Sequence, residues 1–254
     1  AQLSFIRTTD DELLLQERIP RAIPITNYHP IELDLEPGQD RGVQHAVDYS
    51  SGKELTWPMP RAHLLSNGSY HTMITNAGTG YSSCNNIDLT RWKPDRVEDR
   101  TGFFIYVRDL DSNEYWSMGY QPTGKHPDRY ESWFHAGKVQ MARVDQWTET
   151  FMDICVSPEE NMELRKISLT NYAERKRRLE ITSYAEVALN TREADASHPA
   201  FSKLFIETEY LPEYHSILAR RRPRSENDET LWMVHTLASD EFNNMHEPLQ
   251  FETD

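Results

Sequence analysis

Glycine, hydroxyl and amide side chains are concentrated in one segment, SNGSYHTMITNAGTGYSS, at residues 66–83. Glycine-rich loops can hold a phosphate, and Gly78 and Gly80 are the residues that such a loop would use here. A dinucleotide-binding loop needs a third glycine and a helix directly after it, whereas the following residues, CNNIDLTRW, have no helical pattern. We therefore predict a strand, a turn with glycines at positive φ, and a second strand.

Paired carboxylates form a second pattern that chemistry could use. Glu207 and Glu209 are two positions apart in FIETEYLPEYH, so they share a face if this segment is a strand. Two carboxylates on a concave sheet face could act as general acid and base. They could equally lie on the solvated side of an edge strand, which is the interpretation that we favour.

The histidines, serines and cysteines show no spacing typical of a metal site or a catalytic triad. The ten histidines contain no H-E-x-x-H pattern, the serines of residues 66–83 lack a G-x-S-x-G frame, and His198 is expected to be structural. Cys84 and Cys155 are predicted to be free thiols, with a single bridge between them as the alternative. We predict no catalytic residue, no metal and no cofactor in this chain.

Aromatic residues crowd residues 81–147. Such rings bury a large area, and they can also stack on the apolar faces of sugars while tyrosine and tryptophan form hydrogen bonds with hydroxyl groups. We expect most of them in the core and two or three on a groove. The residues concerned are Tyr81, Trp92, Tyr106, Tyr115, Trp116, Tyr120, Tyr130, Trp133 and Trp147.

The charge balance limits the partners. The chain has 254 residues with 27 Lys and Arg against 41 Asp and Glu, which gives a formal net charge of −14. Nucleic acids and anionic membranes need a basic face, so the composition argues against both as partners. No apolar run approaches the length of a membrane span, and the N-terminus lacks the pattern of a signal peptide.

The first part of the chain differs in composition from the rest. Residues 8–19 predict a short helix, because Thr9 can cap its start and Pro20 ends it. Residues 20–60 hold six of the 14 prolines, which excludes long regular elements. We therefore divide the chain into residues 1–60, a helix tail and Pro-rich linker that wraps the body and has room for one short strand, and residues 61–254, the folded domain.

From Leu64 onward, apolar residues alternate with polar ones, which is the signature of strands. The clearest example is RRLEITSYAEVAL, which predicts one strand with Leu179 to Leu189 alternating on one face. No helix is predicted after residue 19, and FSKLFIETEYL is assigned to a strand. Many short strands separated by turn residues predict an all-β sandwich or barrel.

The order of several segments resembles a known family. HLLSNGSYHTMITNAGTGYS, DLTRW, FFIYVRDLDSNEYWS, SPEENMELRKISLTN, LEITSYAEVAL and HPAFSKLFIETEY are similar, in this order, to the β-supersandwich domain of glycoside hydrolase family 94, formerly glycosyltransferase family 36. The similarity covers roughly residues 60–240. HPAFSKLFIETEY and RRRPRS resemble the branch of the family that makes β-1,2-linked glucan more than the cellobiose and chitobiose phosphorylases.

The resemblance implies a large two-sheet antiparallel supersandwich of the galactose-mutarotase-like kind. It also implies a non-catalytic, carbohydrate-associated role, with the chemistry in an adjacent (α/α)6 barrel. The implied partners are β-1,2-linked glucan, that catalytic domain of the same polypeptide, or a second copy in a homodimer. The implied location is the cytoplasmic side of a bacterial inner-membrane protein.

Carried over residue by residue, the resemblance makes Tyr81, Ser82, Arg91 and Trp92 the candidates for contact with sugar or a neighbouring domain. This chain has Thr79 where the family usually has a glycine. Two alternatives stay open. One is a mutarotase-like sugar epimerase, for which His198, His215, Glu207 and Glu209 are the candidate residues. The other is a purely structural or dimerisation domain.

Overall fold

The structure, a computed structural model, describes residues 61–93, 100–223, 230–238 and 250–252, together with the backbone of residues 43–45. The predicted helix over residues 8–19 and most of the Pro-rich lead-in lie outside the described residues. Within the described part of the lead-in, the backbone of residues 43–45 forms the short strand β1 (Val43–His45), which pairs with Ser132, Trp133 and Phe134.

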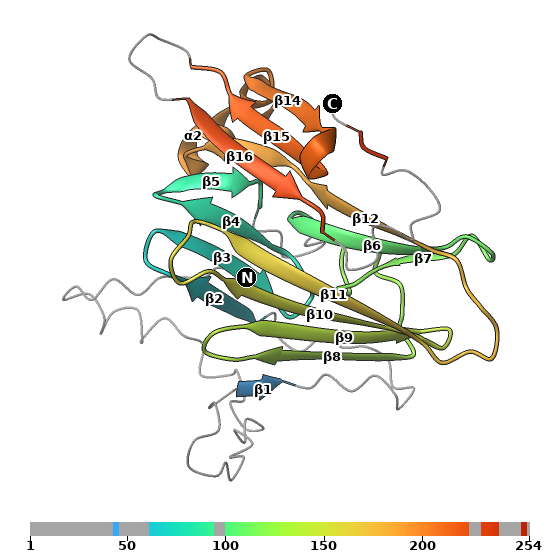
Figure 1. The fold of residues 1–254 in the computed structure, drawn as a ribbon. Coiled ribbons are helices and arrows are strands. Elements are labelled where there is room, and N and C mark those ends of the chain that lie inside the picture. The colour runs from blue at the N-terminus through green and yellow to red at the C-terminus, as the bar shows by residue number, and fades with distance from the viewer. Residues whose placement is uncertain (1–42, 46–60, 94–99, 224–229, 239–249, 253–254) are drawn as a thin grey trace.

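The described chain is built mainly from antiparallel β-strands, as predicted (Figure 1). The strands before residue 120 are β2 (Ala62–Ser66), β3 (Tyr70–Thr75), β4 (Gly80–Cys84), β5 (Ile87–Thr90), β6 (Phe103–Asp109) and β7 (Tyr115–Ser117). The later ones are β8 (Arg129–Phe134), β9 (Val139–Asp145), β10 (Thr148–Val156), β11 (Glu163–Asn171), β12 (Leu179–Ala185), β13 (Val187–Asn190), β14 (Ile206–Leu211), β15 (Ser216–Arg221) and β16 (Leu231–Thr236).

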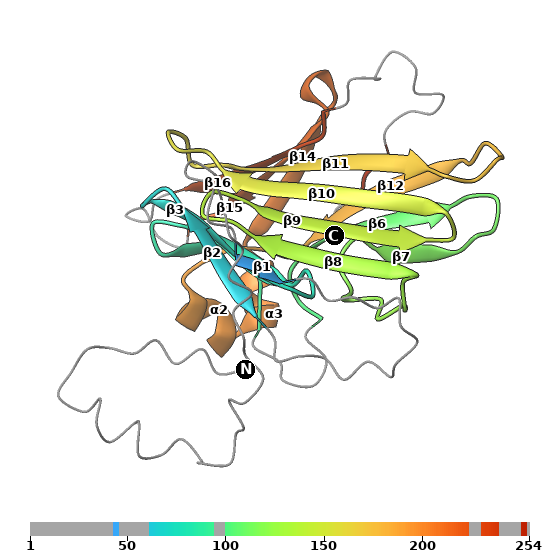
Figure 2. The same ribbon diagram turned by 90° about the horizontal axis from the view of Figure 1, so that it is seen from below.

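Hydrogen bonds group these strands into four sheets. Their orders are β1-β8-β9-β10-β11, β12-β6-β7, β13-β5-β4-β3-β2 and β14-β15-β16. The first sheet forms one layer, and the β12-β6-β7 sheet lies behind it (Figure 2). This arrangement confirms the predicted all-β sandwich architecture.

The main core lies between these layers. Every second side chain of a strand points to the same face, so alternate residues of β6–β10 build this core. One residue of β2 and one of β3 complete it. The members are Leu65, Ile74, Ile105, Val107, Trp116, Met118, Phe134, Val139, Met141, Met152 and Ile154. Trp116 is fully buried, which confirms that the core takes part of the aromatic cluster predicted from the sequence.

The predicted strand over residues 179–189 is two strands. β12 pairs with β6, whereas β13 pairs with β5 in another sheet. The change occurs at Glu186, whose carbonyl oxygen accepts a hydrogen bond from the backbone N–H of Arg91. An alternating pattern records which residues share a face, but it carries no information about which partner strand they pair with.

The prediction that no helix follows residue 19 is wrong. α2 (Arg192–Ser197) and α3 (Pro199–Lys203) follow β13, and a 3₁₀ turn, η1 (Pro212–Tyr214), follows β14. Thr191 caps α2 by accepting a hydrogen bond from the N–H of Ala194, and Pro199 occupies the first turn of α3. The strand assigned to residues 201–211 therefore begins only at Ile206.

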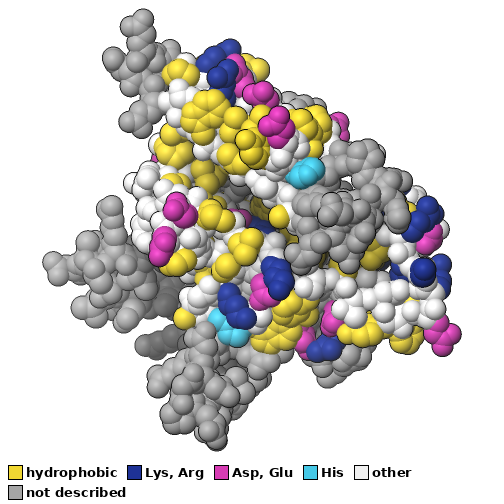
Figure 3. Space-filling view, viewed as in Figure 1, with side chains coloured by type: hydrophobic (Ala, Val, Ile, Leu, Met, Phe, Trp, Pro, Cys, Tyr) yellow, Lys and Arg dark blue, Asp and Glu magenta, His cyan; other side chains and the backbone are white. Residues whose placement is uncertain are grey.

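The surface seen in Figure 3 mixes both signs of charge. Lys and Arg side chains lie beside Asp and Glu side chains, and apolar side chains gather over β15 and β16. Trp232 and Val234 of β16 are among the exposed apolar residues. Cys84 and Cys155 are free thiols, as predicted. Within the described part of the chain, no helix is both long and apolar enough to cross a membrane.

Candidate functional site

The glycine turn joins β3 to β4 and sets the position of Tyr81 and Ser82. Gly78 and Gly80 have φ values of +89° and +151°, which side chains other than glycine rarely adopt. A Cβ atom on Gly80 would lie 1.8 Å from the carbonyl oxygen of Met73. Because β4 follows the turn directly, the segment is strand, turn and strand, and the phosphate-loop alternative is excluded.

Tyr81 and Trp92 come together in an aromatic cluster. Their ring centroids are 5.8 Å apart, and the His71 ring packs against Tyr81 in a T-shaped arrangement with a centroid distance of 5.8 Å. The guanidinium of Arg192, from α2, lies over the Tyr81 ring at 4.0 Å. Arg192 is itself held by both carboxylate oxygens of Asp88, at 2.9 and 3.1 Å. Strand β4, the segment after β5 and helix α2 thus each contribute to the cluster.

Only part of this cluster reaches solvent. Tyr81 is 8% exposed, whereas Trp92 is half-buried and the Arg192 side chain is 43% exposed. The indole Nε1 of Trp92 is buried and has no hydrogen-bond partner among the described residues. A ligand would therefore meet the Trp92 ring and the Arg192 guanidinium, while Tyr81 supports them from beneath.

Ser82 points to the other face of β4 and does not join the cluster. Its Oγ donates a hydrogen bond to Oε2 of Glu163, at 2.7 Å, and Arg165 donates to Oε1 of the same carboxylate at 2.9 Å. Burial opposes ionisation of Glu163, but the Arg165 charge and the hydroxyls of Ser82 and Thr72 hold its pKa below the usual value. Ser82 therefore connects the β4 sheet to β11.

We predict that Glu163 makes the stability of the domain sensitive to acid. A carboxylate whose pKa is lowered by folding stabilises the native state above its unfolded pKa, about 4.3, and loses that contribution as pH falls through the folded value. Glu163→Gln should therefore flatten the fall in unfolding free energy below about pH 4.3. Urea denaturation across that range measures it. Glu209→Gln is the matched control, because Glu209 is exposed. If the unfolding free energy falls equally steeply with acid in both variants, Glu163 is not the source of the acid sensitivity.

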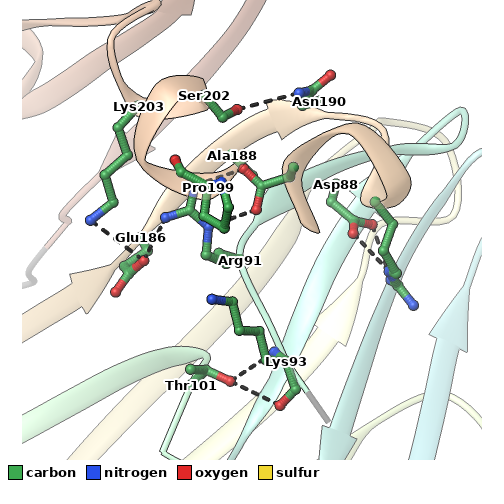
Figure 4. A network of polar contacts seen from close by, with 12 residues as sticks. Asp88, Arg91, Lys93, Thr101, Glu186, Ala188, Asn190, Pro199, Ser202 and Lys203 are labelled. Carbon is green, nitrogen blue, oxygen red and sulfur yellow. Dashed lines mark hydrogen bonds and ion pairs between the residues drawn. The ribbon is translucent and has the colours of Figure 1, made fainter. Parts of the chain in front are cut away.

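Arg91 is a buried clamp (Figure 4). Its Nε and Nη2 donate to the two carboxylate oxygens of Asp195, both at 2.6 Å, and its Nη1 donates to Glu186 at 2.9 Å. Nη2 also approaches the carbonyl oxygen of Pro199, at 3.4 Å. These contacts join the end of β5 to α2, α3 and the point where the chain passes from β12 to β13.

The clamp also fixes the protonation states of its members. Hydrogen bonds and charge from Asp195, with a contribution from Glu186, raise the pKa of Arg91. Burial opposes ionisation of Asp195, yet the Arg91 guanidinium lowers its pKa below the usual value. All three side-chain nitrogens of Arg91 are engaged, so its role here is to hold α3 and α2, the helix that carries Arg192.

The sequence-predicted candidates are therefore divided by the structure. Trp92 and Tyr81 lie in the cluster, Arg91 lies beneath it in the clamp, and Ser82 lies on the opposite face of β4. Sequence reasoning missed Asp88 and Arg192, which complete the cluster, and Asp195, which completes the clamp. The cap residue Thr191 before READAS was the signal that could have revealed the helix carrying the last two.

The residues proposed for an epimerase occupy turns and an ion-paired strand. Both histidines are exposed. His198 lies between α2 and α3, and His215 directly follows η1. Glu207 and Glu209 share a face of the edge strand β14, as predicted, and Glu207 pairs with Arg220 at 2.6 Å. Among the described residues, no group of three His, Cys, Asp or Glu side chains is arranged to hold a metal.

The chain matches known proteins over most of its length. Residues 48–254 match the family model described as "Glycosyl hydrolase 94, supersandwich domain". Over 250 residues, 96% of this chain, it is 34% identical to the cyclic beta-(1,2)-glucan synthase NdvB of Rhizobium meliloti. It is 25% identical over 61% of its length to the N,N'-diacetylchitobiose phosphorylase of Vibrio proteolyticus. The matched regions span 8% of the synthase and 20% of the phosphorylase.

Proposed function

The chain belongs to the glycosyl hydrolase 94 supersandwich domain family, and on that premise we propose that it is a non-catalytic domain of a β-1,2-glucan synthase. Its role is to position β-1,2-linked glucan and to orient an adjacent (α/α)6 catalytic barrel of the same polypeptide. In this proposal the parent is a bacterial inner-membrane protein, with the domain on the cytoplasmic side.

The pairing of carboxylates with arginines supports a role without catalysis. A general acid at neutral pH needs a raised pKa, which burial or a neighbouring negative charge provides. In this chain, Arg91 lowers the pKa of Asp195, and Arg165 lowers that of Glu163. Both carboxylates therefore stay ionised and paired, which suits a structural role. Burial raises the pKa of a third carboxylate, Asp145, but its side chain is 2% exposed and bonded to Arg143, so it does not reach a glycosidic oxygen.

The cluster of Trp92, Tyr81 and Arg192 supports contact with sugar, and it is the observation that carries the proposal. An aromatic ring can pack against the C–H face of a pyranose, and a guanidinium beside it can donate to hydroxyl groups. The Asp88 carboxylate fixes Arg192 in place, so little side-chain freedom is lost on binding. We expect weak, saturable affinity from one such platform.

We predict that Trp92→Ala weakens binding of linear β-1,2-glucooligosaccharides by about tenfold, the equivalent of about 1.4 kcal/mol. Calorimetric titration of the 254-residue chain measures this, with cellooligosaccharides to test linkage selectivity. The matched control is Trp147→Ala, because Trp147 is 69% exposed and lies in the turn after β9. Equal losses in the two variants, or equal affinity for both linkages, would contradict the assignment.

The absence of catalysis is tested in the same samples. We expect the oligosaccharides to keep their length after prolonged incubation with the chain, with and without inorganic phosphate. Chromatography of the sugars provides the measurement. If the oligosaccharide became shorter, and if this activity stayed with the protein through purification and disappeared when the protein was denatured, the domain would be catalytic. That result would overturn the proposal.

A different surface supports the orienting role. Trp232 is 51% exposed and Val234 is 58% exposed, and both lie on the same face of β16 because they are two positions apart. Arg220 of β15 lies over the Trp232 ring at 5.6 Å. Exposed apolar groups beside a charge are typical of domain contacts. We assign the contact with the adjacent barrel to this face, with a second copy in a homodimer as the competing partner.

A further inference from the structure

An open groove lies on the outer face of the β12-β6-β7 sheet. Its volume is about 440 Å³, within the range of small-molecule sites, which is about 300–1,000 Å³. Because successive side chains of a strand alternate, Ile105 and Val107 of β6 face the core while Tyr106 and Arg108 face the groove. The lining residues are Tyr106, Arg108, Asn113, Tyr115, Glu180 and Thr182.

The register of the strands sets these side chains in two adjacent rows. Arg108 lies opposite Glu180 on one side and Tyr115 on the other, and Tyr106 lies opposite Thr182. Tyr115 is 60% exposed, so its ring is available to a ligand. The groove thus has an aromatic surface at one edge and charged and hydroxyl groups across its floor.

The polar groups of the groove are held in place before any ligand binds. Asn113 has a φ of +61°, in the turn between β6 and β7. Its Oδ1 accepts hydrogen bonds from Nε and Nη2 of Arg108, at 3.0 and 2.6 Å. This contact orients the guanidinium plane and leaves Nη1 directed toward Glu180, at 3.9 Å.

The charges of the groove are balanced, which selects the class of ligand. Arg108 and Glu180 are both about half exposed and compensate each other, so a phosphate or a carboxylate meets no net positive charge. A neutral ligand with both apolar faces and hydroxyl groups fits better, since the ring can stack while the guanidinium donates and the carboxylate accepts.

We propose that this groove is a second glucan-binding site, in which the Tyr115 ring stacks on one sugar unit while Arg108 and Glu180 hydrogen-bond its hydroxyls. This inference rests on the proposed function for its ligand, β-linked glucan. The β6–β7 turn and the strands β4 and β5 lie on opposite sides of the molecule (Figure 1). A glucan chain held at both places would be guided across the domain.

The test is an NMR titration of the full chain with linear β-1,2-glucooligosaccharides, in which amide shifts locate each site. We expect saturable shifts in β6, β7 and β12, and Tyr115→Ala should weaken this binding by about tenfold. Tyr115→Phe should bind like the wild type, because it keeps the ring. The matched control is Tyr214→Ala, since Tyr214 is 66% exposed but lies in η1.

The outcomes separate this proposal from the proposed function. Shifts restricted to β4, β5 and α2, with no effect of Tyr115→Ala, would overturn the groove and leave the Trp92 site intact. Shifts at the groove that Tyr115→Ala removes and Trp92→Ala leaves unchanged would support the groove alone. No saturable shift anywhere at millimolar sugar would overturn both sugar sites. An unchanged thermal unfolding midpoint shows that each variant is folded.

Discussion

Gly80→Ala is expected to destabilise the domain by about 3 kcal/mol or more, which is a large fraction of the roughly 5–15 kcal/mol that stabilises a typical domain. A Cβ atom at this position would lie 1.8 Å from the carbonyl oxygen of Met73 and 2.8 Å from its carbonyl carbon. Both contacts are with backbone of the paired strand, so no side-chain rotation can relieve them. The β3–β4 hairpin would have to separate, and Tyr81 would move with it. Circular dichroism and urea denaturation of the purified variant measure the loss.

The matched control separates the clash from the backbone conformation. Gly68 also has a positive φ, +103°, but an added Cβ atom would meet nothing within 4 Å. Gly68→Ala should therefore cost only the conformational penalty, about 1–2 kcal/mol. If the two variants lose equal stability, the close approach of β3 and β4 does not determine the effect, and the prediction is wrong.

Asp195→Ala is expected to cost about 3–5 kcal/mol, because it leaves the Arg91 guanidinium buried without its main partner. The Arg91 and Asp195 side chains are 5% and 8% exposed, so water cannot replace the lost hydrogen bonds. The destabilisation should extend to α2 and α3, which the clamp attaches to β5. Urea denaturation measures this loss. If the slope of unfolding free energy against urea concentration is unchanged, the shift in midpoint reports a change in stability.

Two further variants make this prediction specific. Glu207→Ala breaks an ion pair whose members are 50% and 38% exposed, and it should cost no more than about 1 kcal/mol. Replacing Arg91 and Asp195 together by leucines should cost clearly less than the sum of the single losses, since the two most buried charges are then both removed and Glu186, which is 33% exposed, keeps Lys203 at 3.7 Å. Additive losses in the double variant would show that the two residues do not act as a pair.

Local patterns of the sequence predicted the local parts of the fold. The strand, glycine turn and strand at residues 70–84 follow from alternation and from the conformational freedom of Gly78 and Gly80. The shared face of Glu207 and Glu209 follows from the same period of two. These features depend on residues close together in the chain, so a single sequence contains them.

The site was predicted only in part, because its contacts are between distant residues. Arg91 and Asp195 are 104 positions apart, and nothing in the spacing of either residue indicates the other. The resemblance made Tyr81 and Ser82 candidates for the same contact with sugar or a neighbouring domain, whereas the pleat of β4 turns them to opposite faces. The transfer of the chain at Glu186 from one sheet to another also depends on partner strands that the alternation does not identify.

The pairing of β5 with β13 sets an order for synthesis. β4 covers one edge of β5, but its other edge stays open until β13 arrives, and the Arg91–Asp195 contact closes only 104 residues later. At about 5–20 residues per second, a ribosome needs roughly 5–20 seconds to supply that stretch. During this interval, the β2–β5 hairpins present unpaired backbone groups to any neighbouring nascent chain. The pairing of β13 with β5 therefore ends the exposure of this edge, and the Arg91–Asp195 contact holds the closed arrangement in place.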